Sequence, residues 1–545
     1  MPDHYFFKQP SLFFYFTVMK ILITDPIEQS CVDILTREGF QVDLKPGLPP
    51  EEIKKIIGDY VAMIVRSGTK VTADIIEHAN AMKVIGRAGA GVDNIDSAAA
   101  SRKGIIVMNT PGGNTISTAE HTLSMMMALA RNIPQAHASL VAGKWDRKKF
   151  MGTELFGKTL GVIGLGKIGA EVAIRAQAFG MTTIGYDPVL SAEVASKMNV
   201  QLVTLDEIYR RSDFITVHTP LNNETRGLLN KETIAKCKKG VRLINCARGG
   251  IIDEAALLEA LESGHVAGAA LDVYSEEPPK DFTLIRHPKV VATPHLGAST
   301  EEAQEKVAIQ IAHQIADALK DRGIVGAVNA SALQAGIPIE IKPFLQLAEK
   351  LGMLQAQVMN GKLKELSIEL RGELLHKYSE LLKAGVLRGL LSKLIQIHEP
   401  INYINAPVVA QSLGVRVSEK KEAEAENYTN LLTIAYKTDE EERSFAGTVF
   451  GGKYLKIVRL DRYYLEGTPE GTYLYYTNID RPGMLAKVGA ILAEANINIA
   501  GLSLGRTGVG ERALTVVQVD NPIPDSVLKK VQSLDGVFHA KVVVL

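Results

Sequence analysis

Three polar residues have the types and the spacing that a hydride-transfer site needs. Arg248 lies in NCARGG, Glu277 in LDVYSEEPP and His295 in TPHLGAS, and each follows an apolar run typical of a strand. An arginine fork can hold a carboxylate and polarise a forming carbonyl, and a histidine can take a hydroxyl proton near neutral pH. A carboxylate can orient that histidine. Any one of them alone would more simply be structural, but together they predict oxidation of a 2-hydroxy acid.

A glycine-rich turn upstream predicts the other reactant, a dinucleotide. Gly164-Leu-Gly-Lys-Ile-Gly169 follows the strand-like LGVI and leads into a helical pattern. Gly164 permits the tight turn, Gly166 lets the backbone approach a pyrophosphate, and Gly169 lets the helix pack on the strand. Asp187 ends the next strand, where an acidic side chain accepts the ribose 2′-hydroxyl and disfavours a 2′-phosphate. The pattern therefore favours NAD over NADP, and a glycine turn without a ligand is the alternative.

Alternating strand-like and helix-like segments must position these residues. One alternation runs from Met19 to about Gly104, and a second runs from KTLGVIGLG to KVVATPHLG. Their continuous apolar strands are typical of parallel sheets covered on both faces. Long helices are expected at Ser117–Ile133, with a Ser/Thr cap, from Gly297 to about Arg322, and at Phe344–Met359. Residues 471–545 follow a βαββαβ, ferredoxin-like pattern.

Length and composition set the wider frame. A chain of 545 residues predicts three or four domains, and its formal net charge of zero gives no reason to expect nucleic acid or a membrane surface. Cys31, Cys237 and Cys246 are too few for a disulfide framework or a zinc site, so we expect no metal and a cytoplasmic protein. Residues 1–18 are rich in Phe but make a poor signal peptide and are too short to span a bilayer. They are predicted to be a dispensable extension before Met19, with an anchor or targeting segment as the alternative.

Five segments together resemble the D-2-hydroxyacid dehydrogenase family: GVIGLGKIG, VHTPLNNETRGLLN, INCARGGIIDE, AALDVYSEEPP and TPHLGAST. The similarity extends from Lys20 to about Asn329, and it implies that Arg248, Glu277 and His295 are the catalytic residues. Lys167 stands where the family more often has Arg, and Ala90 where it often has Thr. The implied NAD contacts are Ala90, Gly164, Gly166, Lys167, Ile168, Gly169, Asp187, Thr219, Cys246, Ala247, Arg248, Asp272, His295, Gly297 and Ala298.

The resemblance also implies the domain order. In that family a Rossmann-type NAD domain, here 119–300, is inserted into a flavodoxin-like α/β substrate domain, here 19–118 and 301–329, with the active site in the cleft between them. Residues 330–465 resemble the α+β intervening domain of the long forms of the family. Residues 471–545 resemble an ACT domain, a small ferredoxin-like module that binds amino acids.

Further polar residues suggest a phosphorylated substrate. The candidate substrate contacts are Arg66, Ser67, Arg87, Gly89, Asn94 and Arg147. They offer more cationic capacity than lactate or glycerate would need, because arginine forks match phosphate oxygens. The resemblance is strongest to family members that oxidise 3-phosphoglycerate in serine biosynthesis, and it implies that Arg66 and Ser67 face the phosphate. It also implies that the loop GKWDRKKF, with Arg147, reaches a partner's active site, although a solvated basic loop is the alternative.

Two other functions stay open at this stage. A glyoxylate or hydroxypyruvate reductase could use the same scaffold, and it would not need Arg66. A non-catalytic NADH-sensing adaptor, like the corepressors that resemble this family, could retain the same three polar residues.

The ACT-like segment implies control by a small molecule. Such modules pair, which implies a homo-oligomer, a dimer or a tetramer, and they hold effectors between copies. Asp480 and Asn498 would then flank L-serine, the carboxylate facing its ammonium group. Asn478 stands where a serine-sensitive relative can carry Tyr, and a module used only for dimerisation is the alternative.

Overall fold

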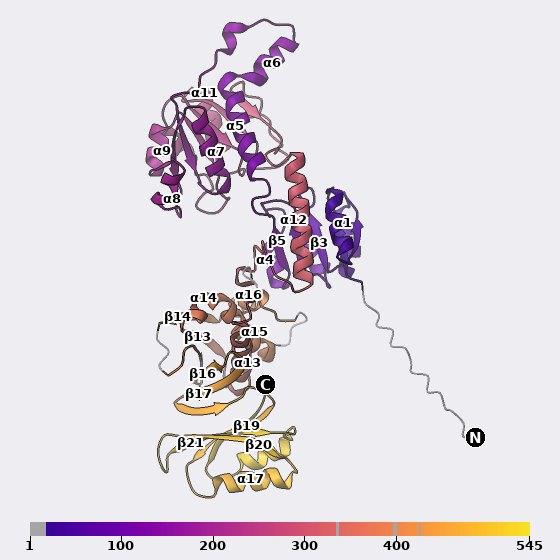
Figure 1. Ribbon diagram of the computed structural model, residues 1–545, viewed down its shortest axis with the longest axis vertical. Coiled ribbons are helices and arrows are strands. Elements are labelled where there is room, and N and C mark those ends of the chain that lie inside the picture. The colour runs from indigo at the N-terminus through magenta and orange to yellow at the C-terminus, as the bar shows by residue number, and fades with distance from the viewer. Residues whose placement is uncertain (1–17, 334–336, 396–399, 424–426) are drawn as a thin grey trace, which may run out of the picture.

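The structure is a computed structural model that describes residues 18–333, 337–395, 400–423 and 427–545. The predicted extension therefore lies almost wholly outside the described residues. Within them the chain forms four sheets of five, seven, six and four strands, spread along the long axis of the molecule (Figure 1). None of the described helices is long and apolar enough to cross a membrane.

The five-stranded sheet is parallel, with the order β2-β1-β3-β4-β5. Helix α12 (Glu301–Leu319) packs on this sheet although it lies far along the chain, and Ile311 and Ile315 occupy the space that a Cβ on Gly86 would need. The strands are β1 (Lys20–Ile23), β2 (Gln41–Leu44), β3 (Ala62–Val65), β4 (Val84–Arg87) and β5 (Ile106–Asn109), and the other helices are α1 (Gln29–Arg37), α2 (Pro50–Ile56), α3 (Ala73–His78) and α4 (Ser97–Arg102). The boundaries expected at 118/119 and 300/301 stay predictions.

The seven-stranded sheet is also parallel, with the order β12-β11-β10-β9-β6-β7-β8. The strand order reverses between β6 and β9, and such a reversal opens a ligand crevice at the carboxyl ends of the strands. The strands are β6 (Thr159–Ile163), β7 (Thr182–Tyr186), β8 (Gln201–Leu202), β9 (Phe214–Val217), β10 (Val241–Asn245), β11 (Val266–Leu271) and β12 (Val290–Ala292). Its helices include α7 (Lys167–Ala178), α8 (Ala192–Lys197), α9 (Leu205–Arg211), α10 (Lys231–Ala235) and α11 (Glu254–Glu262).

Helix α5 (Thr115–Arg131) leaves the cleft between the two sheets and packs against α7. It begins two residues before the expected Ser117, and Asn114 at its N-cap makes no side-chain capping bond, so the expected Ser/Thr cap was wrong. Two of its methionines pack in the core, since Met125 and Met126 are buried. Beyond α5, α6 (Ile133–Val141) and the 3-10 turn η2 (Arg147–Phe150) form an arm that projects from the upper end of the molecule (Figure 1).

The third sheet carries helices α13 (Lys342–Val358) and α15 (Ser379–Leu394), and its order is β14-β13-β15-β16-β17-β18. The first half of the charged run Ser418–Asn427 belongs to the exposed edge strand β14 (Arg416–Glu422), as a solvated face would, and its residues 424–426 lie outside the described residues. The remaining elements are β13 (Leu363–Arg371), α14 (Glu373–Lys377), α16 (Asn405–Ser412), β15 (Leu431–Thr438), β16 (Glu442–Phe450), β17 (Tyr454–Leu460) and β18 (Tyr463–Gly467).

The last sheet is antiparallel in the order β20-β21-β19-β22, which confirms the ferredoxin-like expectation. It contacts helix α13, which packs on the third sheet, through Lys541, whose Nζ donates to the carbonyl oxygen of Val358 at 2.8 Å. The third sheet's unit in turn meets the first at Asn402, whose Nδ2 donates to the carbonyl oxygen of Gly104 at 3.0 Å. The elements are β19 (Thr472–Ile479), α17 (Met484–Glu494), β20 (Ile499–Arg506), β21 (Arg512–Val519), α18 (Asp525–Gln532) and β22 (Val537–Val544).

Candidate active site

A histidine and a glutamate form a hydrogen-bonded pair after the last two strands, β11 and β12, of the seven-stranded sheet. His295 Nδ1 lies 2.7 Å from Glu277 Oε2, and Glu277 Oε1 accepts the backbone N–H of Tyr274 at 3.0 Å. Burial alone would raise the pKa of Glu277, but these hydrogen bonds outweigh it and hold the pKa below its ordinary 4.5. An ionised carboxylate only accepts, so Nδ1 carries the proton and Nε2 is left as a proton acceptor.

This pair lines a cavity of about 660 Å³ in the cleft between the two parallel sheets. The first sheet contributes Arg66 and Ser67 from the loop after β3, and Arg87 and Gly89 from the end of β4. The second sheet contributes Arg248, which follows β10. Parallel strands end at one edge, so residues far apart in sequence meet there. The other predicted site residues in the wall are Ala90 and Ala298.

Arg248 is engaged across the cleft by a residue that the sequence did not single out. Its Nε donates to Asp93 Oδ2 at 2.9 Å, and its Nη1 donates to the carbonyl oxygen of Ala247 at 2.7 Å. Asp93 lies in GVDN, one residue before the predicted Asn94, and it lines the same cavity. A carboxylate beside a cluster of predicted arginines was the signal that could have revealed it.

Arg87 gives the cavity an under-satisfied positive charge. Its Nη1 donates to the carbonyl oxygen of Gly91, but its Nε is buried without a hydrogen-bond partner. Burial, with repulsion from Arg248, lowers the pKa of Arg87 to about 10. An anion in the cavity would satisfy the unpaired N–H and the charge together.

Two predicted substrate residues lie outside the cavity wall of this chain. Asn94 donates from Nδ2 to the carbonyl oxygens of Arg66 and Thr69, at 2.7 and 2.6 Å, so it holds the loop that presents Arg66. Arg147 lies on the exposed arm, in the turn η2, and does not line the cavity.

The glycine-rich turn has the shape that a dinucleotide requires. Gly164 has φ 91° and lies so close to the next strand that a Cβ would be 2.6 Å from the carbonyl oxygen of His218. A Cβ on Gly169 would collide with the carbonyl oxygen of Gly164, whereas nothing lies within 4 Å of such an atom on Gly166. The space above Gly166, at the start of α7, is therefore open to a pyrophosphate. Thr219 Oγ1, on the neighbouring loop, is buried without a partner, as expected of an atom that a ligand satisfies.

Other predicted cofactor residues shape this crevice. Asp187 accepts the N–H groups of Leu165, Val189 and Leu190, at 2.9, 2.9 and 3.0 Å, so it holds the glycine turn and keeps further lone pairs for a ribose hydroxyl. Lys167 donates to the carbonyl oxygen of Pro111 at 3.3 Å, in the strand-to-helix connection at the cleft.

The remaining predicted contacts flank the same crevice. Cys246 is buried, and burial raises the pKa of its thiol to about 12, so it is no nucleophile. Ala247 follows it in the loop after β10, Ile168 is the second residue of α7, and the backbone N–H of Gly297 donates to Asp272 Oδ2 at 2.8 Å.

The two predicted effector residues, which flank strands of the last sheet, already have side-chain partners. Asp480 Oδ2 lies 3.3 Å from Arg506 Nη1, and Asn498 Nδ2 donates to Asp520 Oδ2 at 2.6 Å. Asn478 is buried rather than open to a ligand, and its Nδ2 donates to the carbonyl oxygen of Ile479 at 2.7 Å.

Comparison with known proteins places three family models on the chain. The model of the D-isomer specific 2-hydroxyacid dehydrogenase NAD binding domain matches residues 123–297. The D-3-phosphoglycerate dehydrogenase intervening domain matches residues 340–461, and the ACT domain matches residues 472–536.

Similar proteins extend this match to nearly the whole chain. A D-3-phosphoglycerate dehydrogenase of Methanocaldococcus jannaschii is 44% identical over 527 residues, which cover 96% of this chain and 100% of the relative. One of Synechocystis is 43% identical over 531 residues, which cover 97% and 95%. A solved glyoxylate reductase from Paecilomyes thermophila shares 31% identity, with a TM-score of 0.53 over 57% of this chain and 98% of its own.

Proposed function

The chain belongs to the D-3-phosphoglycerate dehydrogenase family, and we propose that it oxidises 3-phospho-D-glycerate to 3-phosphooxypyruvate with NAD, the first step of phosphorylated L-serine biosynthesis. The observation that carries this proposal is the His295–Glu277 hydrogen bond in the wall of a cavity that also holds Arg248, Arg66 and Arg87. A histidine nitrogen that can accept a proton, an arginine that can bind a carboxylate and further arginines that can bind a phosphate thus line one cavity.

The residues have separable tasks in this reaction. Arg66, Ser67 and Arg87 bind the phosphate end, while Arg248 holds the carboxylate and polarises the carbonyl as it forms. His295 takes the hydroxyl proton on Nε2, and Glu277 stabilises the imidazolium that results. Bound NAD supplies the hydride acceptor, and the turn at Gly166, Asp187 and Thr219 would hold it.

We also propose the division into domains that the family order implies: 19–118 with 301–329, 119–300, 330–465 and 471–545. The first range contains the five-stranded sheet and the second contains the seven-stranded sheet, while the third contains the six-stranded sheet except for the last two residues of β18. A cytoplasmic location is part of the proposal, supported by three unpaired, buried cysteines.

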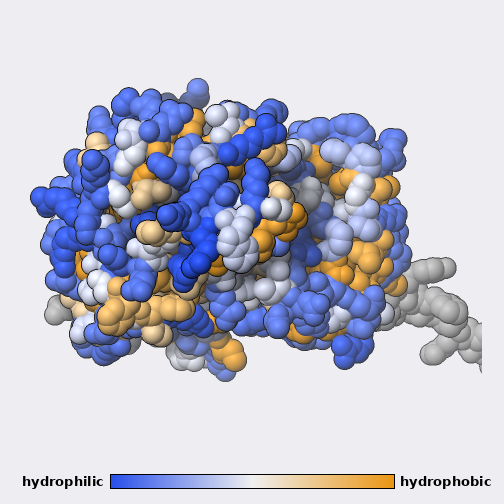
Figure 2. Space-filling view, turned by 90° about the horizontal axis from the view of Figure 1, so that it is seen from above, coloured by the Kyte–Doolittle hydropathy of each residue, from blue (hydrophilic) through white to orange (hydrophobic). Residues whose placement is uncertain are grey.

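The arm at α6 supports a homo-oligomer. Seen from above, hydrophobic side chains lie among hydrophilic ones on this end of the molecule (Figure 2). Val141 and Met151 are 74% and 81% exposed, and no residue of α6 is buried within the chain. An apolar arm of this kind needs a cover, and a second copy would bring its Arg147 toward the neighbouring active site.

L-serine is the proposed effector of the ACT domain. Asp480 and Asn498 lie where the first turn and the following strand begin, and their present partners, Arg506 and Asp520, are side chains that a ligand can replace. Product feedback then needs serine to favour one arrangement of the domains over another.

The direct test is a spectrophotometric assay of NADH formation from 3-phosphoglycerate, with unphosphorylated D-glycerate beside it. Turnover that strongly prefers the phosphorylated acid supports the proposal. Turnover of hydroxypyruvate or glyoxylate in its place would make the chain a reductase, and no turnover of any of them would favour an NADH-sensing adaptor.

A further inference from the structure

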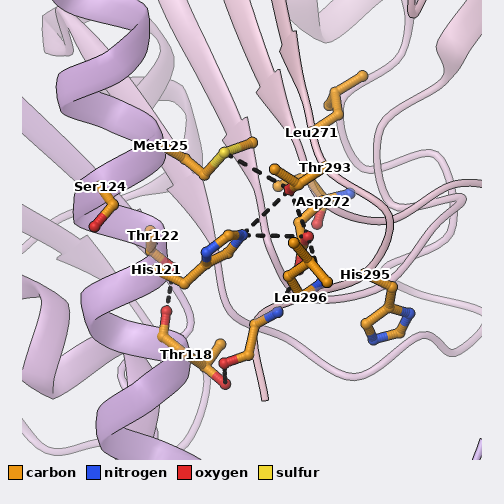
Figure 3. Close-up of polar contacts among 12 residues, drawn as sticks. Thr118, His121, Thr122, Ser124, Met125, Leu271, Asp272, Thr293, His295 and Leu296 are labelled. Atoms are coloured by element: carbon orange, nitrogen blue, oxygen red, sulfur yellow. Dashed lines mark hydrogen bonds and ion pairs between the residues drawn. The ribbon is translucent and has the colours of Figure 1, made fainter. Parts of the chain in front are cut away.

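A second contact between a histidine and a carboxylate lies near His295, between His121 and Asp272 (Figure 3). His121, on α5, has Nε2 3.2 Å from Asp272 Oδ1 and 3.2 Å from Thr293 Oγ1. The side chain of Asp272 is only 1% exposed and that of His121 is 19% exposed. His121 does not line the cavity, and the proposed reaction assigns it no task.

Asp272 holds the segment that carries His295. Its backbone carbonyl accepts the N–H of His295 at 2.9 Å, and its carboxylate accepts the N–H groups of Leu296 at 2.7 Å and Gly297 at 2.8 Å. His295 has φ 56°, a left-handed conformation that is uncommon for a residue with a side chain. Such a conformation persists where surrounding contacts fix it, and these three bonds to one residue do so.

The buried carboxylate of Asp272 in turn depends on side-chain donors. Thr293 Oγ1 donates to Asp272 Oδ1 at 2.6 Å, but the same hydroxyl also has the sulfur of Met125 within 3.7 Å as a competing acceptor (Figure 3). A hydroxyl has one proton to give, and a carboxylate only accepts. A proton on His121 Nε2 therefore serves both neighbours, because it is donated to the threonine oxygen and to the carboxylate.

We propose that His121 is a positioning residue for the dehydrogenase reaction. Its Nε2–H orients the Thr293 hydroxyl toward Asp272 and completes the donors around that carboxylate, which holds His295 at the angle from which Nε2 reaches the substrate hydroxyl. The inference rests on the proposed function, because it assigns a role in that reaction. His121 lies on α5, the helix that begins at the cleft and joins the two sheets. The same helix therefore also fixes the position of the proton acceptor His295.

Two substitutions separate this role from simple packing. His121→Leu fills similar space without a donor, whereas His121→Gln places an amide N–H near the former Nε2. His121→Leu should lower kcat by about tenfold to a hundredfold, as expected when a catalytic group is slightly misplaced, with the KM for 3-phosphoglycerate within twofold. His121→Gln should restore kcat to within about threefold of the unsubstituted protein. Ser124→Ala, on the same helix and outside the network, is the matched control.

A double variant adds a readout that packing does not predict. Because part of the His121 effect passes through Thr293, the loss of kcat in His121→Leu/Thr293→Val should be clearly smaller than the product of the two single losses. A full kcat in His121→Leu, a kcat in His121→Gln as low as in His121→Leu, or a loss in the double variant equal to the product of the single losses would each overturn the proposal. Thermal unfolding of every variant shows whether it folds. If His121→Leu does not fold, His121→Asn replaces it, because its amide is too short to reach Thr293 and Asp272.

The unsubstituted protein separates this proposal from the proposed function. If it turns over a different 2-hydroxy acid, the assignment of 3-phosphoglycerate is wrong, and the same ratios of kcat are measured on that acid. Those ratios alone then decide whether His121 positions His295.

Discussion

Asp93 and Arg248 meet across the cleft, with 2.9 Å between the carboxylate oxygen Oδ2 and the guanidinium Nε. They lie 155 residues apart, one on the loop after β4 and the other after β10. The ion pair leaves the arginine aimed into the cavity, in contact with the loop at Gly91. One contact thus joins the sheet that carries the proposed phosphate-binding residues to the sheet that carries the proposed catalytic pair.

Replacing Asp93 by Asn should lower kcat/KM for 3-phosphoglycerate by about fivefold to tenfold. A charge-assisted hydrogen bond contributes about 1.5–3 kcal/mol when shielded from water, and less here because the Asp93 side chain is 70% exposed. Steady-state kinetics measure this change. Asp74→Asn removes an exposed carboxylate of the same sheet unit and should leave kcat/KM unaltered, and equal losses in both variants would contradict a specific role for Asp93.

Glu277→Gln should lower kcat on the order of a hundredfold while NAD binding is retained, because the amide keeps the size but cannot stabilise an imidazolium. The folded pKa of Glu277 is depressed below 4.5, so its charge and the bond to His295 persist at higher pH and are lost as the pH falls through that folded pKa. A pH profile of kcat should therefore show no titration of Glu277 above about pH 4.5. An undiminished kcat in the variant would remove Glu277 from the mechanism.

Arg66→Ala should raise the KM for 3-phosphoglycerate far more than the KM for unphosphorylated D-glycerate. The guanidinium of Arg66 donates to the carbonyl oxygen of Pro26 at 3.2 Å and lines the cavity, so its loss removes a phosphate partner without exposing the core. A loss of one charged hydrogen bond predicts a rise of about tenfold or more. The comparison of the two substrates is its own control, since equal effects on both would show that Arg66 does not face the phosphate.

Asp187→Asn should shift cofactor preference from NAD toward NADP. The single amide oxygen can still accept the N–H groups of Val189 and Leu190, although the NH2 group cannot accept from Leu165, and the side chain no longer repels a 2′-phosphate. The ratio of kcat/KM for NAD to that for NADP should fall by about tenfold, corresponding to about 1.4 kcal/mol. An unaltered ratio, with the fold intact by circular dichroism, would confine Asp187 to holding the glycine turn.

Titration with L-serine should inhibit the protein, and Asp480→Ala should raise the half-inhibitory concentration by about tenfold or more, because the effector's ammonium group loses its carboxylate. The inhibition of each variant is expressed relative to its own rate without serine. Asp525→Ala, on the other ACT helix, is the matched control. Full inhibition of the Asp480 variant would place the effector elsewhere, and no inhibition of the unsubstituted chain would leave the ACT domain as an assembly module.

Much of the site follows from local patterns in the sequence. Residue type and position after a strand are enough to predict the turn at Gly164, the acid at Asp187 and the triad Arg248, Glu277 and His295. Parallel strands carry such residues to a common edge, so the gathering of the triad at one cavity followed from the strand order alone. The glycine turn was equally readable, because its backbone geometry is encoded within six residues.

What only the tertiary structure decided is which side chains pair. Asp93 contacts Arg248 at a sequence separation of 155 and His121 contacts Thr293 at a separation of 172, while Arg147 does not line the cavity of its own chain. Helix α5 also begins at Thr115, before its expected cap at Ser117. Hydrophobic periodicity and turn chemistry act over a few residues. A hydrogen bond between distant segments depends on how whole sheets and helices pack, so no local sequence pattern predicts it.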